Sequence, residues 1–279
     1  MPRAPSRARY AIDLHLHSTW SDGTLTPAAL VAAAARRGVR TIALTDHDTT
    51  DGVAEARAAG AAKGVSIIAG IELSAWLDRE IHILGYFVDP AHDGLLAVTR
   101  RQSEARVRRV EAICERLAAL GVVLDPAPII ASAAGNVGRP HIARALVAAG
   151  HVATTTEAFD RYLGNNAPAV VPVERLLAAD AIALIHAAGG VAVLAHPGVE
   201  QLEDHIAALA AAGLDGLEVD HPAHGRPLAD RLRTRALKHR LVPTGGSDFH
   251  RPEGTIAIGH YGVTAAGLAA LLDRRPAAA

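Results

Sequence analysis

The feature that most constrains this chain is a series of seven short apolar segments, most of them followed by a helical pattern. The segments begin at Ala11 and then cover residues 39–44, 65–73, 80–87, 191–195, 217–219 and 241–244. Helical patterns cover about 26–37, 53–63, 173–188, 201–212 and 227–239. Strands that alternate with helices are typical of a parallel α/β sheet or barrel. We therefore predict an α/β fold with seven strands.

The middle of the chain follows a different pattern. No strand is evident between Asp89 and Pro168, and residues 94–121 carry an apolar stripe at helical spacing. The stripe consists of Val107, Val110, Ile113 or Cys114, Leu117 and Leu120. The arginines of residues 101–109 fall mostly off it, so we expect them on a solvated face. We predict a helical insertion over residues 95–170, which forms a substrate cap between barrel parts 1–94 and 171–279.

Side chains that can bind metals stand at or near the ends of the predicted strands. The carboxyl ends of barrel strands meet at one face of the fold. His15 and His17 alternate with an apolar Leu16 on the first strand, so both project from the same side, and Asp22 follows in a turn with glycine. A single histidine there would usually be structural, but many strand ends together predict a metal site. The candidates are His15, His17, Asp22, His47, Glu72, His82, His196, His221, Asp248 and His250.

Composition narrows the class of protein. The chain has 279 residues, half of them apolar, which suffices for a substantial core. A net charge of −1 argues against binding of long duplex nucleic acid. One cysteine, Cys114, cannot form an intrachain disulfide, and no run of about 18 apolar residues is present. We expect a cytoplasmic enzyme that binds no membrane and needs no protein partner.

Several separated motifs together resemble those of the PHP (polymerase and histidinol phosphatase) family. The motifs are His15-x-His17 with Asp22, the segment 45–48, Gly70-Ile71-Glu72, and the segments 82–86, 195–197 and 246–250. This resemblance implies a distorted (β/α)7 barrel that holds up to three divalent ions, usually Mn, Zn or Fe.

The resemblance also implies how the ligands are divided among the ions. One ion would take His15, His17, Glu72 and Asp248; a second would share Glu72 and add His82 and His196; a third would take Asp22, His47 and His250. Asp22 stands where some family members have His, so the third site is harder and favours Mn or Mg over Zn. We expect two or three ions, with Mn first and Zn, Fe or Mg as alternatives.

The insertion narrows the resemblance to one bacterial branch of the family. Its segments 138–144 and 159–163 are similar to those of nucleoside 3',5'-bisphosphate phosphatases and related 5'-to-3' exoribonucleases that act on short RNA. The function implied is hydrolysis of a nucleotide phosphate ester by a metal-bound hydroxide. Long single-stranded RNA should bind weakly, because few aromatic residues are available for stacking. The candidates are Trp20, Trp76, Tyr86, Phe159 and Tyr162.

Other polar residues suggest supporting roles. Arg139 and His141 enter a predicted helix, and we expect them to hold a phosphate at its N-terminus, whereas Arg144 is expected on a solvated face. His221 and His224 follow another strand and are candidates for a general acid or for substrate binding. Carboxylates beside the metal candidates are expected to orient the ligand imidazoles; they are Asp13, Asp46 and Asp48.

Three alternatives remain open. A histidinol-phosphate-type phosphatase would use the same site. A metal amidohydrolase also places His-x-His on its first strand, but many such enzymes bridge two ions with a carbamylated lysine. The only lysines, Lys63 and Lys238, lie in predicted helices, whereas Glu72 is well placed as a bridge. The third alternative is a noncatalytic PHP module, against which the full set of candidate ligands argues.

Overall fold

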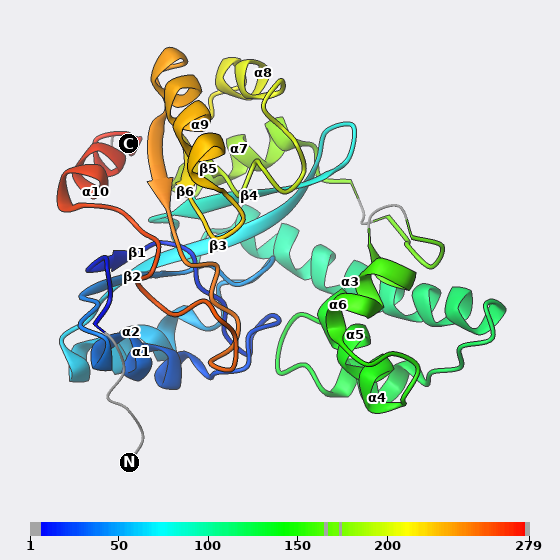
Figure 1. Ribbon diagram of the computed structural model, residues 1–279. Coiled ribbons are helices and arrows are strands. Elements are labelled where there is room, and N and C mark those ends of the chain that lie inside the picture. Colours follow the sequence, from blue (N-terminus) through cyan, green and yellow to red (C-terminus); the bar gives the residue numbers. More distant parts are fainter. Residues whose placement is uncertain (1–6, 165–166, 173–174, 277–279) are drawn as a thin grey trace.

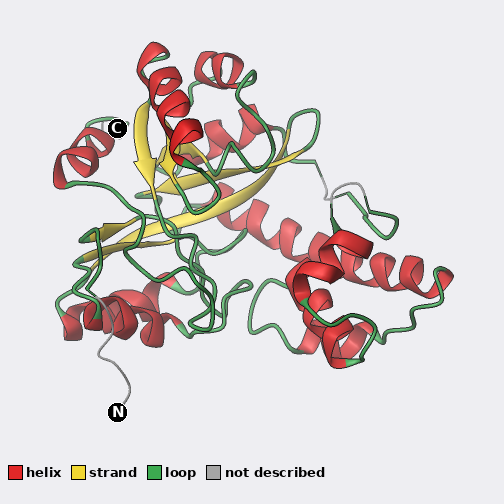
Figure 2. Cartoon of the chain, in the orientation of Figure 1, coloured by secondary structure: helices red, strands yellow, loops and turns green. Residues whose placement is uncertain are grey.

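The computed structural model describes residues 7–164, 167–172 and 175–276. Its centre is a sheet of seven strands that lie side by side in chain order. The strands are β1 (Ile12–Asp13), β2 (Thr41–Leu44), β3 (Ser66–Trp76), β4 (Glu80–Tyr86), β5 (Val191–Leu194), β6 (Gly216–Asp220) and β7 (Val242–Gly245). Each predicted strand is present, and β3 extends beyond its predicted end at Leu73. The α/β class is confirmed (Figures 1 and 2).

Strand β4 runs antiparallel to both of its neighbours, whereas the remaining neighbouring pairs are parallel. The expectation of a purely parallel sheet is therefore wrong at this strand. Only residues 77–79 separate β3 from β4, and a parallel crossover needs a dozen residues or more. The reversal brings the first half of β4 to the edge where the parallel strands end. Isolated bridges from Ile12 to Val263 and from Leu16 to Phe249 nearly close the barrel.

Helices cover the sheet from outside. In Figure 1, α1 (Pro27–Arg36) and α2 (Val53–Lys63) lie below it, and α7 (Ala178–Ala187), α8 (Ile206–Ala211) and α9 (Arg226–Lys238) lie above it, with α10 (Ala265–Leu272) at one end. Thr26 caps α1 by accepting a hydrogen bond from Ala29 N, and Gly64 ends α2 with a φ of 66°. The helix predicted over 173–188 begins only at Ala178, and residues 173–174 lie outside the described residues.

The insertion forms a separate lobe, on the right of Figure 1. It contains α3 (Asp93–Ala119), α4 (Pro126–Ala131), α5 (Arg139–Ala148), α6 (Thr155–Ala158) and a π-helical turn (Phe159–Leu163). Most of the predicted stripe, including Val110, Ile113 and Leu117, joins a hydrophobic cluster of this lobe. Leu120 is exposed instead, because it follows the last turn of α3. The predicted boundary at residue 95 falls inside α3, whose Leu95 belongs to the core around the sheet.

Two arginines of α3 fix the insertion to the barrel. Arg106 Nη2 lies 2.6 Å from Asp48 Oδ2 and donates to Ser74 Oγ. Arg109 forms a two-pronged ion pair with Glu80 and donates to Val171 O. Both guanidinium groups are buried, so the prediction of a solvated arginine face is wrong for these two residues. They face carboxylates of the barrel, which helical periodicity alone could not reveal.

Among the helices of the described residues, none has both the length and the hydropathy that crossing a lipid bilayer requires.

Candidate metal centre

The predicted metal ligands converge at the edge of the sheet where the parallel strands end. His15 and His17 follow β1, and His47 follows β2. Glu72 lies within the second half of β3, not at its end, and pairs with His47 through an isolated bridge. His82 reaches the same edge from the first half of β4 because that strand is reversed. The loops after β5 and β7 supply the others, namely His196, Asp248 and His250.

Four side-chain atoms meet on one side of Glu72. His15 Nε2 and His17 Nε2 each lie 3.2 Å from Glu72 Oε2. The same two nitrogens lie 3.3 and 3.2 Å from Asp248 Oδ1. His15, His17 and Glu72 are completely buried. These are the four residues that the family resemblance assigns to one ion.

The second carboxylate oxygen of Glu72 faces a different pair of imidazoles. Glu72 Oε1 lies 3.0 Å from His82 Nδ1 and 3.0 Å from His196 Nε2. The two nitrogens are 3.3 Å apart. Glu72 therefore presents one oxygen to each of two ligand groups, which is the arrangement that a bridging carboxylate requires.

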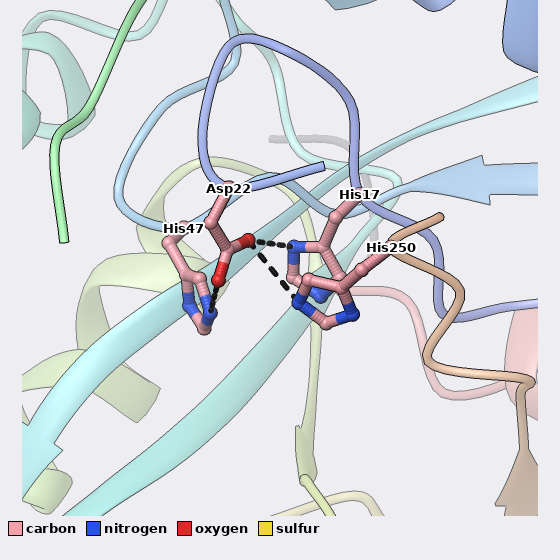
Figure 3. Close-up of side chains that lie close together, drawn as sticks. All are labelled: His17, Asp22, His47 and His250. Atoms are coloured by element: carbon pink, nitrogen blue, oxygen red, sulfur yellow. Dashed lines mark ion pairs between the residues drawn. The ribbon is translucent and has the colours of Figure 1, made fainter. Parts of the chain in front are cut away.

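Asp22 forms the centre of a third group, shown in Figure 3. Its Oδ1 lies 3.1 Å from His250 Nε2 and 3.7 Å from His17 Nδ1, and its Oδ2 lies 3.8 Å from His47 Nε2. His47 also faces Glu72, with its Nδ1 3.2 Å from Glu72 Oε2. His17 and His47 thus stand between the Glu72 and Asp22 groups.

The side chains present fit divalent ions. His17 Nε2 and His47 Nδ1 are buried and have no hydrogen-bond partner among the described residues, although each lies 3.2 Å from Glu72 Oε2. Buried polar atoms are rarely left unsatisfied. Ligand atoms about 2.1 Å from one ion, in tetrahedral or octahedral geometry, lie roughly 3.0–3.4 Å apart. The spacings around Glu72 fall in this range, and imidazole with carboxylate is a usual donor set for Zn, Mn and Fe.

Electrostatics in the absence of a bound metal show how concentrated the negative charge is. Burial disfavours charged imidazole, yet Glu218, Glu72 and Asp248 raise the pKa of His15 to about 10. The pKa of His17 rises to about 9 and that of His250 to about 10, again against the effect of burial. For His47, burial prevails and the pKa falls well below its usual value. The site therefore attracts cations, either protons or metal ions.

Glu218, on β6, is a residue that the sequence analysis missed. Its Oε1 lies 3.1 Å from His15 Nδ1, and its Oε2 accepts a hydrogen bond from the His196 backbone N–H. It is completely buried. A lone glutamate between Leu217 and Val219 looks like an interruption of an apolar strand. Its position could have indicated its role, because it lies two residues before the end of that strand, at the edge of the barrel that carries the candidate ligands.

The three aspartates predicted to orient imidazoles do not contact an imidazole nitrogen directly. Asp13 accepts hydrogen bonds from the backbone of Ser247 and Gly259, and Asp48 binds Arg106 and Ser74 N. Asp46 accepts from Ser21 Oγ, which in turn lies 3.4 Å from His17 Nδ1. That part of the prediction is therefore wrong. Asp46 acts on His17 only through a serine. Outside the candidate ligands themselves, Glu218 and Glu200 are carboxylates that contact ligand imidazoles.

The two candidates for a general acid lie beside the cluster and are engaged in other contacts. His221 Nδ1 accepts from Ala223 N, and its Nε2 lies 3.3 Å from Asp248 Oδ2. His224 Nε2 accepts from Gly198 N, while its Nδ1 donates to Val219 O. Backbone groups thus occupy both nitrogens of His224 in this structure, and its role as an acid stays a prediction. His221 is placed to hold Asp248.

Two cavities adjoin the cluster between the barrel and the insertion. The small cavity, of about 100 Å³, is lined by His47, His82, Arg109, Arg139 and Phe159, among others. The large cavity, of about 550 Å³, adjoins Asp22, Asp248 and His250 and is also lined by Arg144, Phe159 and Arg251. Tyr86, one of the predicted stacking residues, is completely buried, so the barrel core excludes it from base stacking. Phe159 reaches both cavities.

Arg139 and His141 are placed differently, although both lie in the first turn of α5. Arg139 faces the small cavity, donates to Leu163 O and lies 3.8 Å from Glu80 Oε2. His141 Nδ1 instead accepts the Gly138 N–H, and its ring lines a groove beside α4. Burial lowers the pKa of His141 to about 4, so it is a neutral capping group. The structure thus brings Arg139, but not His141, to the cavity beside the cluster.

The backbone is strained at two of the ligand candidates. His196 has a φ of 24° and Asp248 a φ of 49°, values that residues other than glycine rarely adopt. Both lie in the turns that directly follow their strands. By contrast, Lys63 and Lys238 are exposed at the ends of α2 and α9, so neither lysine can bridge ions in this cluster.

Comparison with known proteins identifies relatives over nearly the whole chain. A family model described as PHP domain matches residues 13–161. A 3',5'-nucleoside bisphosphate phosphatase of Chromobacterium violaceum is 38% identical over 89% of this chain and 90% of its own. The 5'-3' exoribonuclease Rnm of Escherichia coli is 38% identical over 91% of this chain and 90% of its own. A solved structure of an amidohydrolase from Chromobacterium violaceum, with bound sulfate and no metal, has a TM-score of 0.86 at 35% identity, covering 96% and 98%.

Proposed function

Because the chain belongs to the PHP family and is a metal-dependent phosphoesterase, we propose that it hydrolyses nucleotide phosphate esters. The substrates proposed are the 3'-phosphate of nucleoside 3',5'-bisphosphates and the first linkage at the 5' end of short RNA. The names of the relatives from Chromobacterium violaceum and Escherichia coli support both substrates. The buried Cys114 fits the cytoplasmic location that we propose.

One observation carries this proposal. The carboxylate of Glu72 faces two imidazole groups through separate oxygens, at 3.0–3.2 Å, in a completely buried position. No network of hydrogen bonds within the protein satisfies all of these atoms, since His17 Nε2 remains without a partner among the described residues. Two adjacent divalent ions would satisfy these atoms. Two metal ions held side by side are suited to in-line displacement at phosphorus.

We propose that His15, His17, Glu72 and Asp248 hold one ion and that Glu72, His82 and His196 hold a second. Asp22, His47 and His250 would hold a third. Bound ions of this kind supply an activated water and stabilise negative charge on the phosphoryl oxygens. We propose Mn as the physiological metal, because the Asp22 group offers a hard carboxylate ligand.

Residues of the insertion complete the proposed site. Arg139 lines the small cavity beside His82 and His47, and a guanidinium group can hold two phosphate oxygens at once. Glu80 faces it from the barrel side and also pairs with Arg109 of α3. His221 holds Asp248 through its Nε2. The protein thus binds and orients the ester from the insertion while the barrel carries the cations.

A single displacement accounts for both proposed substrates. Water attacks the phosphorus attached to O3', the P–O3' bond breaks, and O3' keeps the electron pair and takes up one proton from the water. A bisphosphate then yields a nucleoside 5'-phosphate and inorganic phosphate. An RNA yields a nucleoside 5'-phosphate and a chain shortened by one residue, which again carries a 5'-phosphate.

The test is phosphate or nucleotide release by the protein supplied with Mn. The substrates are adenosine 3',5'-bisphosphate, 5'-AMP, histidinol phosphate and a short 5'-phosphorylated RNA. We expect turnover of the bisphosphate or the RNA, lost in His17→Ala and retained in a matched control, His151→Ala, which lies after α5 and outside the cluster.

Other results would lead to different conclusions. Turnover of histidinol phosphate alone would assign the protein to a biosynthetic phosphatase. If protein shown to contain metal releases no product from any of the four substrates, the proposal is contradicted. The amidohydrolase or noncatalytic alternatives would then be favoured.

A further inference from the structure

A third cavity, around Trp76, has no role in the proposed site. It has a volume of about 530 Å³, and its wall residues come from the β3–β4 hairpin, α3, the end of the insertion and the turn after β5. Glu80 and Arg109 belong to its wall and also to the wall of the small cavity beside His47 and His82. This Trp76 cavity and the small cavity are therefore neighbours.

The three cavities follow one another across the metal centre. The large cavity adjoins the Asp22 group and shares Asp22 and Phe159 with the small cavity. The small cavity in turn shares two wall residues with the Trp76 cavity. The prediction of a solvated face is wrong for Arg144, which is half-buried at the large cavity. A substrate whose ester lies at the cluster thus has space on two sides of it.

Strand β3 connects Trp76 with the metal centre. Side chains of a strand alternate between its faces, so Trp76 projects from the same face as Glu72, four residues earlier. At about 3.4 Å per residue, these two residues lie roughly 13 Å apart along the strand. In the neighbouring strand, Glu80 pairs with Trp76, and His82 pairs with Ser74. The indole ring therefore stands within reach of a nucleotide chain that passes the cluster.

The side chain of Trp76 is not part of the core. It is partly exposed and belongs to none of the hydrophobic clusters that the described residues form. Its backbone N–H donates to Leu176 O at 2.7 Å. This contact brings Arg175 over the ring, with the guanidinium carbon 4.6 Å from the ring centroid. Val199, which is 54% exposed, lies in the same cavity wall.

The charges around the Trp76 cavity leave one basic group available. The carboxylates of its wall already contact basic side chains. The pairs are Asp78 with Arg79 and Glu80 with Arg109, at 2.9 Å each, and Glu200 with His196, at 3.3 Å. Arg175 is exposed and forms no ion pair within the part of the chain that the structure describes. An aromatic ring and a free cation thus lie together at the cavity.

We propose that the Trp76 cavity binds the part of an RNA that follows the scissile ester, with a base stacked at Trp76 and a backbone phosphate at Arg175. This inference rests on the proposed function. Sites for single-stranded nucleic acid combine aromatic rings, on which bases stack, with basic groups along the backbone. A nucleoside bisphosphate ends at the phosphate that lies at the cluster. The Trp76 cavity therefore serves RNA and not the bisphosphate.

A site of this kind separates the two proposed substrates. Both place a 3'-phosphate at the metal cluster, but only RNA continues beyond it. Stacking tolerates any sequence, because every base has a π face, so the protein would shorten short RNAs of different sequence. A single stacking ring beyond the ester also agrees with the weak binding of long RNA that the sequence predicts.

The first experiment compares 5'-phosphorylated triadenylate with adenosine 3',5'-bisphosphate. The quantity measured is the ratio of kcat/KM on the RNA to kcat/KM on the bisphosphate. Trp76→Ala should lower this ratio by about fivefold to a hundredfold, because it removes the stacking ring. Trp76→Phe keeps a smaller ring and should lower the ratio less. Arg175→Ala removes an exposed charge and should lower the ratio by about twofold to fivefold.

Arg161→Ala is the matched control. Its guanidinium carbon lies 4.9 Å from the ring centroid of Tyr162, as that of Arg175 lies over Trp76, but Arg161 is not among the residues that line the three cavities. This variant should keep the wild-type ratio. An unchanged ratio in Trp76→Ala would overturn the inference and leave the proposed function intact. A wild type that hydrolyses the bisphosphate but not the RNA would also overturn it.

Tryptophan fluorescence tests the site without turnover. The chain contains two tryptophans, Trp20 and Trp76, and a base that stacks on an indole ring quenches its emission. The probe is a 5'-phosphorylated triadenylate in which a methylene group replaces O3' of the first linkage, so that this linkage cannot be hydrolysed. We expect a quench in the wild type that is absent from Trp76→Phe.

The fluorescence result distinguishes this inference from the proposed function. If the protein hydrolyses no nucleotide but shows a quench that depends on Trp76, the RNA site stands and the proposed activity fails. If the wild type shows no quench that depends on Trp76, the RNA site is overturned, whatever the protein hydrolyses.

Discussion

The two sides of the candidate metal centre differ in the distances between their ligand atoms and in their exposure to the adjoining cavity. Around Glu72, the ligand nitrogens lie 3.0–3.2 Å from the carboxylate oxygens. Around Asp22, the corresponding distances range from 3.1 to 3.8 Å. Glu72 is completely buried, whereas Asp22 adjoins the large cavity. The Glu72 side is thus the more enclosed of the proposed ion sites, and the Asp22 side is the one that opens to the cavity.

The difference follows from the elements that carry each carboxylate. Glu72 lies within β3, which is hydrogen-bonded to neighbours on both sides. Asp22 lies in the turn before α1, and His250 lies in a loop. Rigid strands hold a side chain more precisely than turns do. Four predictions distinguish the two sides.

The largest effect is expected from Glu72→Ala. Removal of the shared carboxylate deprives both ligand groups of a charge, so the protein should lose two ions, and kcat/KM should fall at least about a thousandfold. Elemental analysis after dialysis, together with the phosphate-release assay, measures both quantities. A variant that keeps its metal content would show that Glu72 does not bridge ions and that the two sides are alike.

Asp22→Asn should have a smaller effect. The amide keeps the shape but removes one charged ligand from the more open side, so we expect the loss of no more than one ion and a decrease of roughly tenfold to a hundredfold in kcat/KM. The same two assays apply. A loss as severe as that of Glu72→Ala, with all metal released, would mean that the Asp22 side also holds the first two ions.

Glu218→Gln tests the support behind the Glu72 side. Its carboxylate contacts His15 Nδ1, which fixes the tautomer that leaves Nε2 free for a metal. Loss of such a partner typically costs about tenfold to a hundredfold in metal affinity. Activity should therefore return at high metal concentration, and Glu218→Asp should recover part of the affinity. Unchanged affinity, measured by competition with a chelating dye, would give Glu218 a purely structural role.

The last prediction concerns the dependence of metal affinity on pH. Without metal, His15, His17 and His250 have raised pKa values of about 10, 9 and 10. Metal ligation needs their neutral form, so binding releases protons, and affinity should rise with pH between 6 and 9. Calorimetry in two buffers of different ionisation enthalpy counts those protons. Affinity that is constant over this range would mean that these imidazoles are already neutral, or are not ligands.

The positions of the candidate ligands could be anticipated from sequence because they lie in compact local patterns. His15-x-His17 and the segment 246–250 each place two metal-capable residues within three positions of each other at a strand end. The seven strands were visible as apolar runs for the same local reason. In these segments, periodicity and turn residues act over a few positions, which is the range that a single sequence reveals.

Features that depend on distant partners could not be anticipated. The burial of Arg106 depends on Asp48, far away in the chain, and nothing around Arg106 distinguishes it from its solvated neighbours. Glu218 acquires its role only when β1 places His15 beside it. The reversal of β4 was readable in principle, since residues 77–79 leave no room for a crossover helix, but its consequence for His82 requires the register of the sheet.

The length of α3 has a consequence for how this protein can vary. The helix starts beyond the far end of β4, passes Ser74 at Gln102, and reaches Asp48 and Glu80 through Arg106 and Arg109. Each residue added to a helix turns everything after it by about 100° and shifts it by about 1.5 Å. An insertion or deletion before Arg106 would therefore rotate the rest of the insertion away from the candidate metal centre. Changes in chain length should therefore hardly be tolerated in the first half of α3.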